Sequence, residues 1–325
     1  MPQPSLNDVH IDAILTNIST AYIQRSGFIA NQVFPVVPVD KQSNKFFVYN
    51  KGDWFRDEAE IRGDGMEAVA SGYTLSTDTY SCDVYAIAKD VGYQLLANAD
   101  APLNPKRDAT EFVTQRLLLK QEKEWVSTFF KTSVWGQTDQ SGVSSAPSTN
   151  QFRQWSDYVN SDPLVDVEGW KETILGSTGF MPNTLVLGYQ VYRQLKNHPD
   201  IVDRFKYTNS STVTTDMLSA LFDIERVLVA SAVENTAAEG ATGSYSFTHG
   251  KAAMLCYVAP SPSLLQPSAG YTFAWTGVSG GLGENVGIKD IPAPLRQADR
   301  VQAEAAWDNK IIGSDLGLFA ATAVA

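Results

Sequence analysis

The sequence is poor in the residues that most often carry chemistry. Its 325 residues include only two cysteines, Cys82 and Cys256, and only three histidines, His10, His198 and His249. The cysteines lie too far apart in the sequence to indicate a zinc knuckle or a redox pair, and we expect two reduced thiols that are buried or half-buried. None of the histidines has a second metal ligand at helical or hairpin spacing. We therefore predict neither a metal site nor a cofactor.

Positive charge and long apolar runs are also scarce. Lys and Arg number 25 against 36 Asp and Glu, which gives a formal net charge of −11. Because neutralising phosphates requires an excess of Lys and Arg, this balance argues against a general binder of nucleic acids or of anionic membranes. No apolar stretch has the ~20 residues that span a bilayer. The first ten residues, MPQPSLNDVH, lack the basic and apolar regions of a signal peptide.

Short motifs that resemble catalytic signatures lack the elements that they require. Residues 277–281 (GVSGG) match G-x-S-x-G, but a nucleophile elbow needs a helix directly after its serine, and glycines and prolines follow instead. The start of a dinucleotide fingerprint at Gly281 fails because Val286 replaces the third small residue. An acidic glycoside hydrolase stays a lower alternative, since no pair among the many carboxylates stands out. We predict that the protein is not an enzyme.

The longest predicted element is a helix from Asn104 to about residue 134. Asn104 is a good N-cap and Pro105 a favourable first helical residue. Spacings of seven, seven and four place one apolar stripe on a single helical face, and we expect this stripe to be core and to pack on a returning strand near Trp307. Its members are Phe112, Leu119, Val126 and Phe130. A second stripe, expected to pack on the N-terminal arm or the adjacent sheet, consists of Leu118, Trp125 and Phe129.

A loop rich in charges and aromatic residues separates two predicted β arms, 45–50 and 72–80. Nine of the 21 residues from Lys51 to Ser71 are charged, and both signs occur. A loop of this length usually has a function or is disordered. Aromatic anchors combined with ion pairs are typical of protein interfaces. An intersubunit arm and a solvated surface loop both fit the sequence. The residues that we assign to an assembly interface are Trp54, Phe55, Arg56, Asp57, Glu58 and Arg62.

The other segments alternate between helix and strand patterns and predict an α+β protein. A short amphipathic helix is expected at 9–23, and the proline-interrupted segment 33–39 should be extended, at an edge or against another surface. Residues 136–154 read as a polar connection, and Asp162–Pro163 opens a helix. An α/β pattern then runs to about residue 275, followed by a glycine-rich loop at 277–287 and extended chain at 298–309.

Four longer stretches carry a family resemblance: MPNTLVLGYQVYRQLKNHPDIVDRFKY (181–207), RVLVASAVENTAAEG (226–240), LCYVAPSPSL (255–264) and AAWDNKIIGSDLGLFAATAV (305–324). Together with the order of elements, they resemble the HK97-fold major capsid proteins of tailed bacteriophages over essentially the whole chain. The resemblance implies an α+β, HK97-like capsid fold. Its parts would be an N-terminal arm (1–38), an extended β-hairpin E-loop (39–81), a peripheral domain (82–162) with a spine helix at about 104–134, an axial α/β domain (163–292) and a C-terminal return into the peripheral domain (293–325).

The function implied by the resemblance is self-assembly into an icosahedral phage head that encloses double-stranded DNA. Contacts of the E-loop, the N-terminal arm and the axial domain would join subunits into pentamers and hexamers, in the cytoplasm of the host bacterium. An acidic subunit suits a container that must not grip its DNA. Because the arm is short, we expect a separate scaffolding protein, besides a portal and an optional decoration protein. The alternative within the fold is the shell protein of an encapsulin-like nanocompartment, which holds protein cargo.

Overall fold

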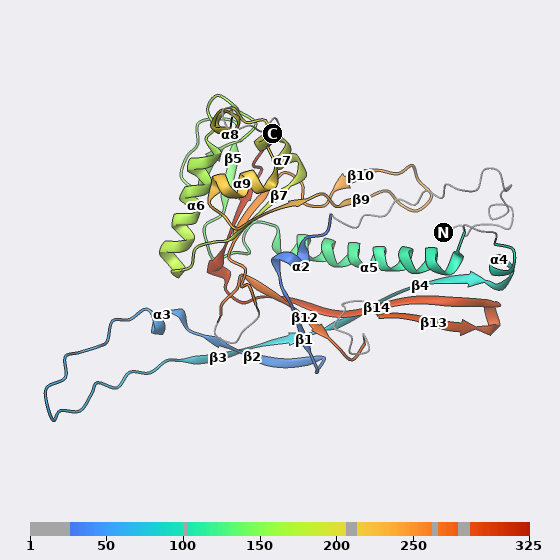
Figure 1. The fold of residues 1–325 in the computed structure, drawn as a ribbon, viewed down its shortest axis with the longest axis horizontal. Helices are drawn as coiled ribbons and strands as arrows, with labels where there is room; N and C mark the ends of the chain where they lie inside the picture. The colour runs from blue at the N-terminus through green and yellow to red at the C-terminus, as the bar shows by residue number, and fades with distance from the viewer. Residues whose placement is uncertain (1–26, 100–102, 206–212, 262–265, 279–286) are drawn as a thin grey trace.

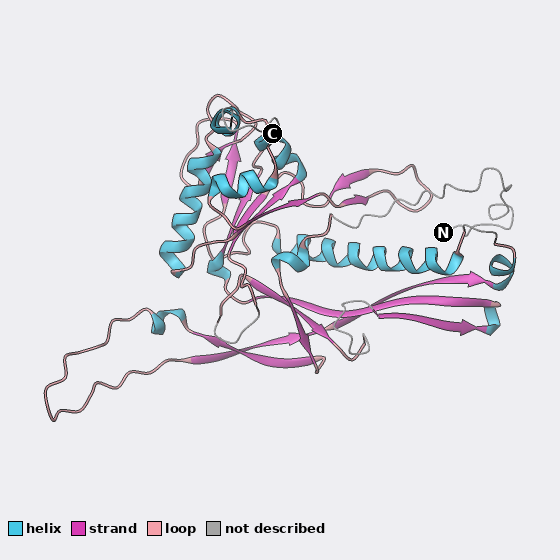
Figure 2. Ribbon diagram, in the orientation of Figure 1, coloured by secondary structure: helices cyan, strands magenta, loops and turns pink. Residues whose placement is uncertain are grey.

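The computed structural model describes residues 27–99, 103–205, 213–261, 266–278 and 287–325. The helix expected at 9–23 and most of the glycine-rich loop at 277–287 lie outside these ranges. Within them, the chain forms a long five-stranded sheet, a compact six-stranded sheet and two two-stranded ribbons. Figures 1 and 2 show the six-stranded sheet with its helices at one end of the molecule and the long sheet extending away from it.

The long sheet is organised around its longest strand, β14. The order is β1-β12-β14-β13, and β4 pairs with β14 along its other edge. All three neighbours of β14 are antiparallel to it, whereas β1 is parallel to β12 at the sheet edge. The prediction that the proline-interrupted segment 33–39 lies at an edge is confirmed by the edge position of β1, since proline lacks the N–H that an interior strand needs. The bounds are β1 (Val36–Val39), β4 (Asp83–Gly92), β12 (Gly270–Trp275), β13 (Gly287–Ala293) and β14 (Ala298–Ile311).

One long helix, α5 (Pro105–Phe129), lies along β14 and β4 (Figure 1). Its 25 residues extend about 37 Å at ~1.5 Å per residue. The predicted start is confirmed: the Asn104 side chain accepts a hydrogen bond from the backbone N–H of Arg107, 3.2 Å away, and Pro105 is the first helical residue. The helix ends five residues before the predicted residue 134.

The buried face of α5 differs from the predicted stripe. Of the four predicted core residues only Phe130 is buried; Leu119 and Val126 are half-buried and Phe112 is 36% exposed. The side chains that pack on β14 near Trp307 are Ala109, Val113 and Leu117. The prediction was therefore wrong by about one residue, which is a rotation of roughly 100°. The second stripe was placed correctly in part, since Trp125 and Phe129 contact Phe34 of the arm, with ring centroids 5.6 and 4.9 Å apart.

The compact unit is a six-stranded sheet in the order β6-β5-β15-β11-β7-β8, with the helices α6, α7 and α9 around it (Figure 1). Every residue of β7 is buried. The Asp162 side chain caps α6 by accepting from the N–H groups of Leu164 and Val165, and Gly179 ends this helix with φ +72. The bounds are β5 (Gln140–Val143), β6 (Gln151–Arg153), β7 (Thr184–Gly188), β8 (Arg226–Ala230), β11 (Ala253–Cys256), β15 (Gly317–Ala321), α6 (Pro163–Thr178), α7 (Tyr189–Lys196) and α9 (Thr215–Phe222).

The two sheets do not follow the boundaries predicted from the sequence. The expected polar connection 136–154 contains β5 and β6, which extend the compact sheet. β12 and β13, predicted within the axial segment 163–292, pair in the long sheet. β15, predicted to return to the peripheral domain, lies between β5 and β11 in the compact sheet. The reason is that periodicity predicts which faces of a strand are buried but not which strand it will pair with.

The remaining elements are short. The chain also forms two ribbons, β2–β3 and β9–β10, and the second runs beside α5 (Figure 1). The bounds are α2 (Ala30–Val33), β2 (Ser43–Tyr49), α3 (Lys51–Trp54), β3 (Leu75–Ser81), α4 (Tyr93–Ala97), α8 (Pro199–Phe205), β9 (Val233–Asn235), β10 (Tyr245–Phe247), and the 3-10 turns η1 (Pro294–Arg296) and η2 (Ser314–Leu316).

Candidate assembly surfaces

The β2–β3 ribbon leaves the long sheet and carries the charged loop away from the body (Figure 1). Its base is anchored by Phe273 of β12, whose ring stacks on Tyr80 at 4.6 Å and contacts Phe46 at 5.3 Å. Farther out, Phe47 is 54% exposed and Leu75 48%. A two-stranded ribbon is marginally stable by itself. The outer part of this ribbon therefore presents apolar side chains without support from its own core.

An aromatic cluster marks the point where the ribbon becomes the loop. The ring of Trp54, in α3, lies 6.1 Å from Tyr49 and 5.9 Å from Tyr73, and the latter two are 5.8 Å apart. Trp54 and Tyr73 nevertheless remain 58% and 61% exposed. Exposed aromatic groups gathered in this way are typical of protein–protein contact sites.

Local hydrogen bonds give this cluster its shape. The Asn50 side chain caps α3 by accepting from the N–H of Gly52 at 3.1 Å. Asp53 accepts from the hydroxyl and the N–H of Thr74, at 2.5 and 2.8 Å, which ties the two ends of the loop together. These two hydrogen bonds lower the pKa of Asp53 below its ordinary value, because they stabilise the carboxylate. The root of the loop is thus ordered by residues close to it in space.

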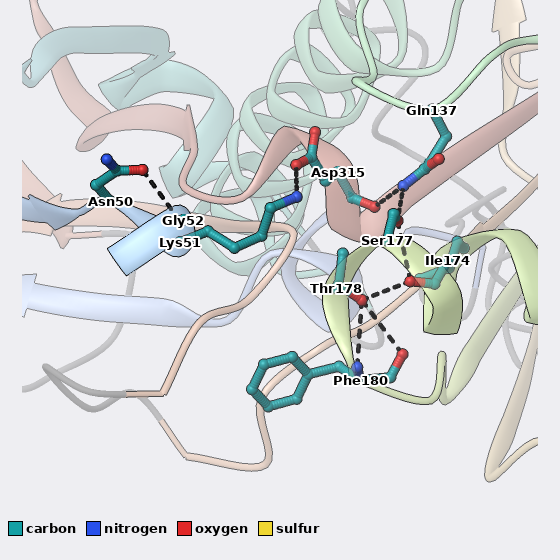
Figure 3. Close-up of polar contacts among 9 residues, drawn as sticks. All are labelled: Asn50, Lys51, Gly52, Gln137, Ile174, Ser177, Thr178, Phe180 and Asp315. Atoms are coloured by element: carbon teal, nitrogen blue, oxygen red, sulfur yellow. Dashed lines mark hydrogen bonds and ion pairs between the residues drawn. The ribbon is translucent and has the colours of Figure 1, made fainter. Parts of the chain in front are cut away.

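A second set of contacts joins this root to the body (Figure 3). Lys51 forms an ion pair with Asp315, which follows β14 in the turn η2. Asp315 is itself positioned because its carbonyl accepts from the Gln137 side chain at 2.7 Å. The Phe55 ring packs at the end of α6, where a Cβ on Gly179 would meet it at 3.4 Å. These contacts therefore fix the position and direction in which the loop leaves the subunit.

The predicted interface residues are all exposed, but the structure does not gather them at one place. Trp54 joins the aromatic cluster, and Phe55, 62% exposed, contacts the end of α6. The four charged residues lie along the exposed loop, where Arg56 and Glu58 form an ion pair at 3.6 Å; the others are Asp57 and Arg62. Solvent-exposed ion pairs of this kind contribute little to stability, so these charges are available to a partner.

Sequence reasoning missed the contacts that fix the loop. Lys51 was only one of nine charges, and its partner Asp315 is 264 positions away. Gly179 ends α6, but nothing in the sequence near it indicates the contact with Phe55. No local pattern signals such pairs, because neither periodicity nor spacing carries information about contacts between distant segments.

A basic aromatic strip forms another exposed surface, on α5 and β4. The ring of Phe112 has the Lys89 ammonium at 5.1 Å and the Arg116 guanidinium at 4.7 Å from its centroid. Lys120 lies 5.5 Å from the ring of Tyr85 in the same way. Cation–π contacts hold these cations in place while leaving their outer sides to solvent. The strip offers positive charge on a chain that is acidic overall.

The described residues offer neither a metal site nor a disulfide. They contain no group of three or more His, Cys, Asp or Glu placed to hold a metal ion. Cys82 and Cys256 are both buried and unpaired. None of the helices in the described ranges is long and apolar enough to cross a membrane.

Two curated relatives align with much of the chain. The major capsid protein of Pseudomonas phage JBD67 is 28% identical over 320 residues, which is 97% of each chain. The major capsid protein of Burkholderia phage BcepMu is 27% identical over 229 residues, 69% of each. No family model matches.

Solved structures share the fold. A phage-related protein from Bordetella bronchiseptica RB50 is 25% identical, with a TM-score of 0.68 over 92% of this chain and 93% of its own. The capsid of Cyanophage P-SCSP1u has a TM-score of 0.60 at 9% identity, covering 98% and 94%. An encapsulin from Synechococcus elongatus PCC 7942 reaches 0.58 at 11%, covering 95% and 93%. The resemblance to phage major capsid proteins is confirmed, and neither the encapsulin nor the hydrolase alternative is favoured, because the named relatives by sequence are capsid proteins.

Proposed function

We propose that this chain is a major capsid protein that self-assembles into an icosahedral phage head enclosing double-stranded DNA. The observation that carries the proposal is the alignment with a phage major capsid protein over 97% of both chains. The mixed helix and strand fold, shared with phage capsids, supports it. We assign the chain no enzymatic role, since its named relatives are structural proteins.

Within this function, we assign the β2–β3 ribbon and the loop 50–74 as the E-loop, an arm that contacts a neighbouring subunit. The exposed aromatic groups Trp54, Phe55 and Tyr73 support this role, because their burial would contribute most of the contact energy of such an arm. The charges at Arg56, Asp57, Glu58 and Arg62 would set the register and choice of partner. α5 with the long sheet would form the peripheral domain and the compact unit the axial domain.

The proposed partners follow from the same function. Copies of the chain would assemble as pentamers and hexamers, with a separate scaffolding protein, a portal and an optional decoration protein. DNA would be enclosed without sequence-specific contact, which fits the net charge of −11. The proposed location is the virion, after assembly in the cytoplasm of the host bacterium.

Electron microscopy of the purified full-length protein, co-expressed with its neighbouring genes, tests the function. We expect closed icosahedral shells. Protein that stays monomeric under these conditions would contradict the shell function. Uniform closed shells from the chain expressed alone would contradict the need for a scaffolding protein.

The E-loop assignment is tested by the double substitution Trp54→Ala and Phe55→Ala. Both side chains are mostly exposed in the subunit, so we expect normal circular dichroism and few or no shells. Tyr245→Ala is the matched control, because Tyr245 is an aromatic residue 75% exposed on a different ribbon; it should assemble normally. Normal shells from the double variant would show that the loop is merely solvated.

A further inference from the structure

Three segments distant in the sequence meet at one buried carboxylate on α5. Helix α5 packs beside α2 (Figure 1), and the side chain of Glu122 on α5 is 1% exposed. One of its oxygens, Oε2, accepts from the N–H of Ala30 at 2.9 Å, and both oxygens accept from the N–H of Ile29, at 3.0 and 3.1 Å. Glu122 therefore caps the first turn of α2 and holds Gly27–Val33, called here the root segment, on α5.

The third segment, between β10 and β11, brings a histidine to the same place. The Nε2 atom of His249 lies 3.5 Å from Oε1 of Glu122, and its side chain is also 1% exposed. Its Nδ1 atom is 3.0 Å from the Thr248 hydroxyl. Among the described residues, Nε2 has no hydrogen-bond partner. The rings of Trp125 and Phe130, with centroids 6.0 and 5.0 Å from the imidazole, make the surroundings apolar.

The number of protons on this pair decides its charge. With one proton, the pair is either a neutral acid beside a neutral imidazole or a carboxylate beside an imidazolium. Its net charge is zero in both forms. With two protons it carries an unmatched positive charge in an apolar site, which is costly. With no proton the carboxylate is negative, and the two N–H groups of α2 offset part of that charge.

We propose that Glu122 and His249 form a pH-sensitive clamp, which holds the root segment on α5 until a second proton enters the pair and opens it. The clamp lies within one subunit, so it does not depend on the proposed shell.

The direction of the pKa changes sets the pH at which the clamp opens. Burial raises the pKa of Glu122 from 4.5 to about 6, although the N–H groups of α2 act in the opposite direction. Burial lowers the pKa of His249 from 6.5 to about 3. Between pH 6.5 and 4.5 the closed and open forms bind nearly the same number of protons, because Glu122 takes up the proton that His249 refuses. Below pH 4.5 only the open form takes up a second proton.

These values convert into an opening equilibrium. From these four pKa values, opening should become about fivefold more favourable from pH 7 to 4.5, and about ninefold more favourable again from pH 4.5 to 3. The pair thus makes opening respond weakly to pH above 4.5 and more steeply below it.

Among the residues that the structure describes, no other charged group on the elements around the pair acts on it directly. On α5, Lys123 pairs with Glu234 of β9 at 2.5 Å, and Glu124 lies 3.8 Å from Lys120. Lys251, after His249, is exposed. The root segment has no titratable side chain, and burial is the one cause of the low pKa of His249.

The test is hydrogen exchange of the root segment in the full-length protein, measured between pH 7 and 3 and corrected for the intrinsic rate. The amides of Ile29 and Ala30 report the clamp directly, because they donate to Glu122. In the wild-type protein we expect their protection to fall about fivefold from pH 7 to 4.5 and about ninefold from pH 4.5 to 3. Protection of the buried strand β7 should persist over the same range, which shows that the opening is local.

The variant Glu122→Gln gives the sharpest outcome. It leaves His249 alone, so protection should begin to fall near pH 6.5 and be about 100-fold lower by pH 4.5. His249→Gln should do the opposite, with protection rising as the pH falls from 6 to 4.5. Glu124→Gln, a neighbour on the same helix, should match the wild type. A wild-type profile that falls as far as that of Glu122→Gln between pH 6.5 and 4.5, or one that Glu122→Gln leaves unchanged, would overturn the proposal.

Discussion

Two leucines on α5, two residues apart, distinguish the buried face in the structure from the face predicted by spacing. Leu117 is 4% exposed and packs with Val301 and Trp307 of β14. Leu119, which belongs to the predicted stripe, is only half-buried. The two substitutions Leu117→Ala and Leu119→Ala remove the same atoms from the same helix. Since alanine favours helix at least as well as leucine, any loss of stability reports packing.

The magnitudes should differ clearly. Truncating a fully buried leucine costs about 2–5 kcal/mol, because the lost transfer free energy is added to that of the cavity. A half-buried leucine loses only part of its transfer free energy, about 1 kcal/mol, and solvent fills the space. At an m-value of about 3 kcal/mol/M, the urea midpoint should fall by roughly 1 M for Leu117→Ala and by about a third of that for Leu119→Ala.

Urea unfolding of the two full-length variants, followed by far-UV circular dichroism in the same state of assembly, measures this difference. Equal m-values would show that both variants unfold from the same compact state. A loss for Leu119→Ala as large as that for Leu117→Ala would refute the buried face described here and restore the predicted one.

Two further predictions concern the thiols and the root of the loop. Burial raises the pKa of Cys82 to about 11 and that of Cys256 to about 12. Neither thiol should therefore react with a thiol reagent at pH 8 in the folded protein, whereas both should react in denaturant. Rapid reaction of the native protein would contradict their burial. Asp315→Asn removes the ion pair between Lys51 and Asp315, whose side chains are 44% and 40% exposed. The unfolding free energy should therefore fall by no more than about 1 kcal/mol, while hydrogen exchange at residues 51–55 rises. Wild-type protein in 1 M salt should approach the same exchange rate, and unchanged exchange in both cases would show that the contact does not hold the loop.

The sequence could predict features that arise from neighbouring residues. Asn104 and Pro105 start α5 because capping needs only the first turn of a helix, and Asp162–Pro163 starts α6 in the same way. The proline-interrupted segment was expected to be extended, at an edge or against another surface, and β1 lies at a sheet edge. The two β arms predicted on either side of the charged loop are also strands, β2 and β3.

What the sequence could not predict depends on contacts between distant residues. The α5 stripes at spacings of seven and four are nearly parallel, and only the position of β14 decides that Val113 is buried and Phe112 is not. The burial of Glu122 was missed although the sequence carried a signal for it. Glu122 lies four residues after Leu118 and three before Trp125, and so belongs to the same helical face as this apolar stripe. A charged residue inside an apolar stripe indicates either an error in the stripe or a buried partner, and here the partner is the root segment.

The place of β14 and β15 in the two sheets bears on how the protein is made. β14 is the strand on which β4, β12 and β13 all pair, and β15 separates β5 from β11. Both strands come late in the sequence, after residue 297. Neither sheet can be completed before these two strands have been synthesised. Until then the apolar faces and strand edges that β14 and β15 cover stay exposed, which makes an unfinished chain prone to aggregation.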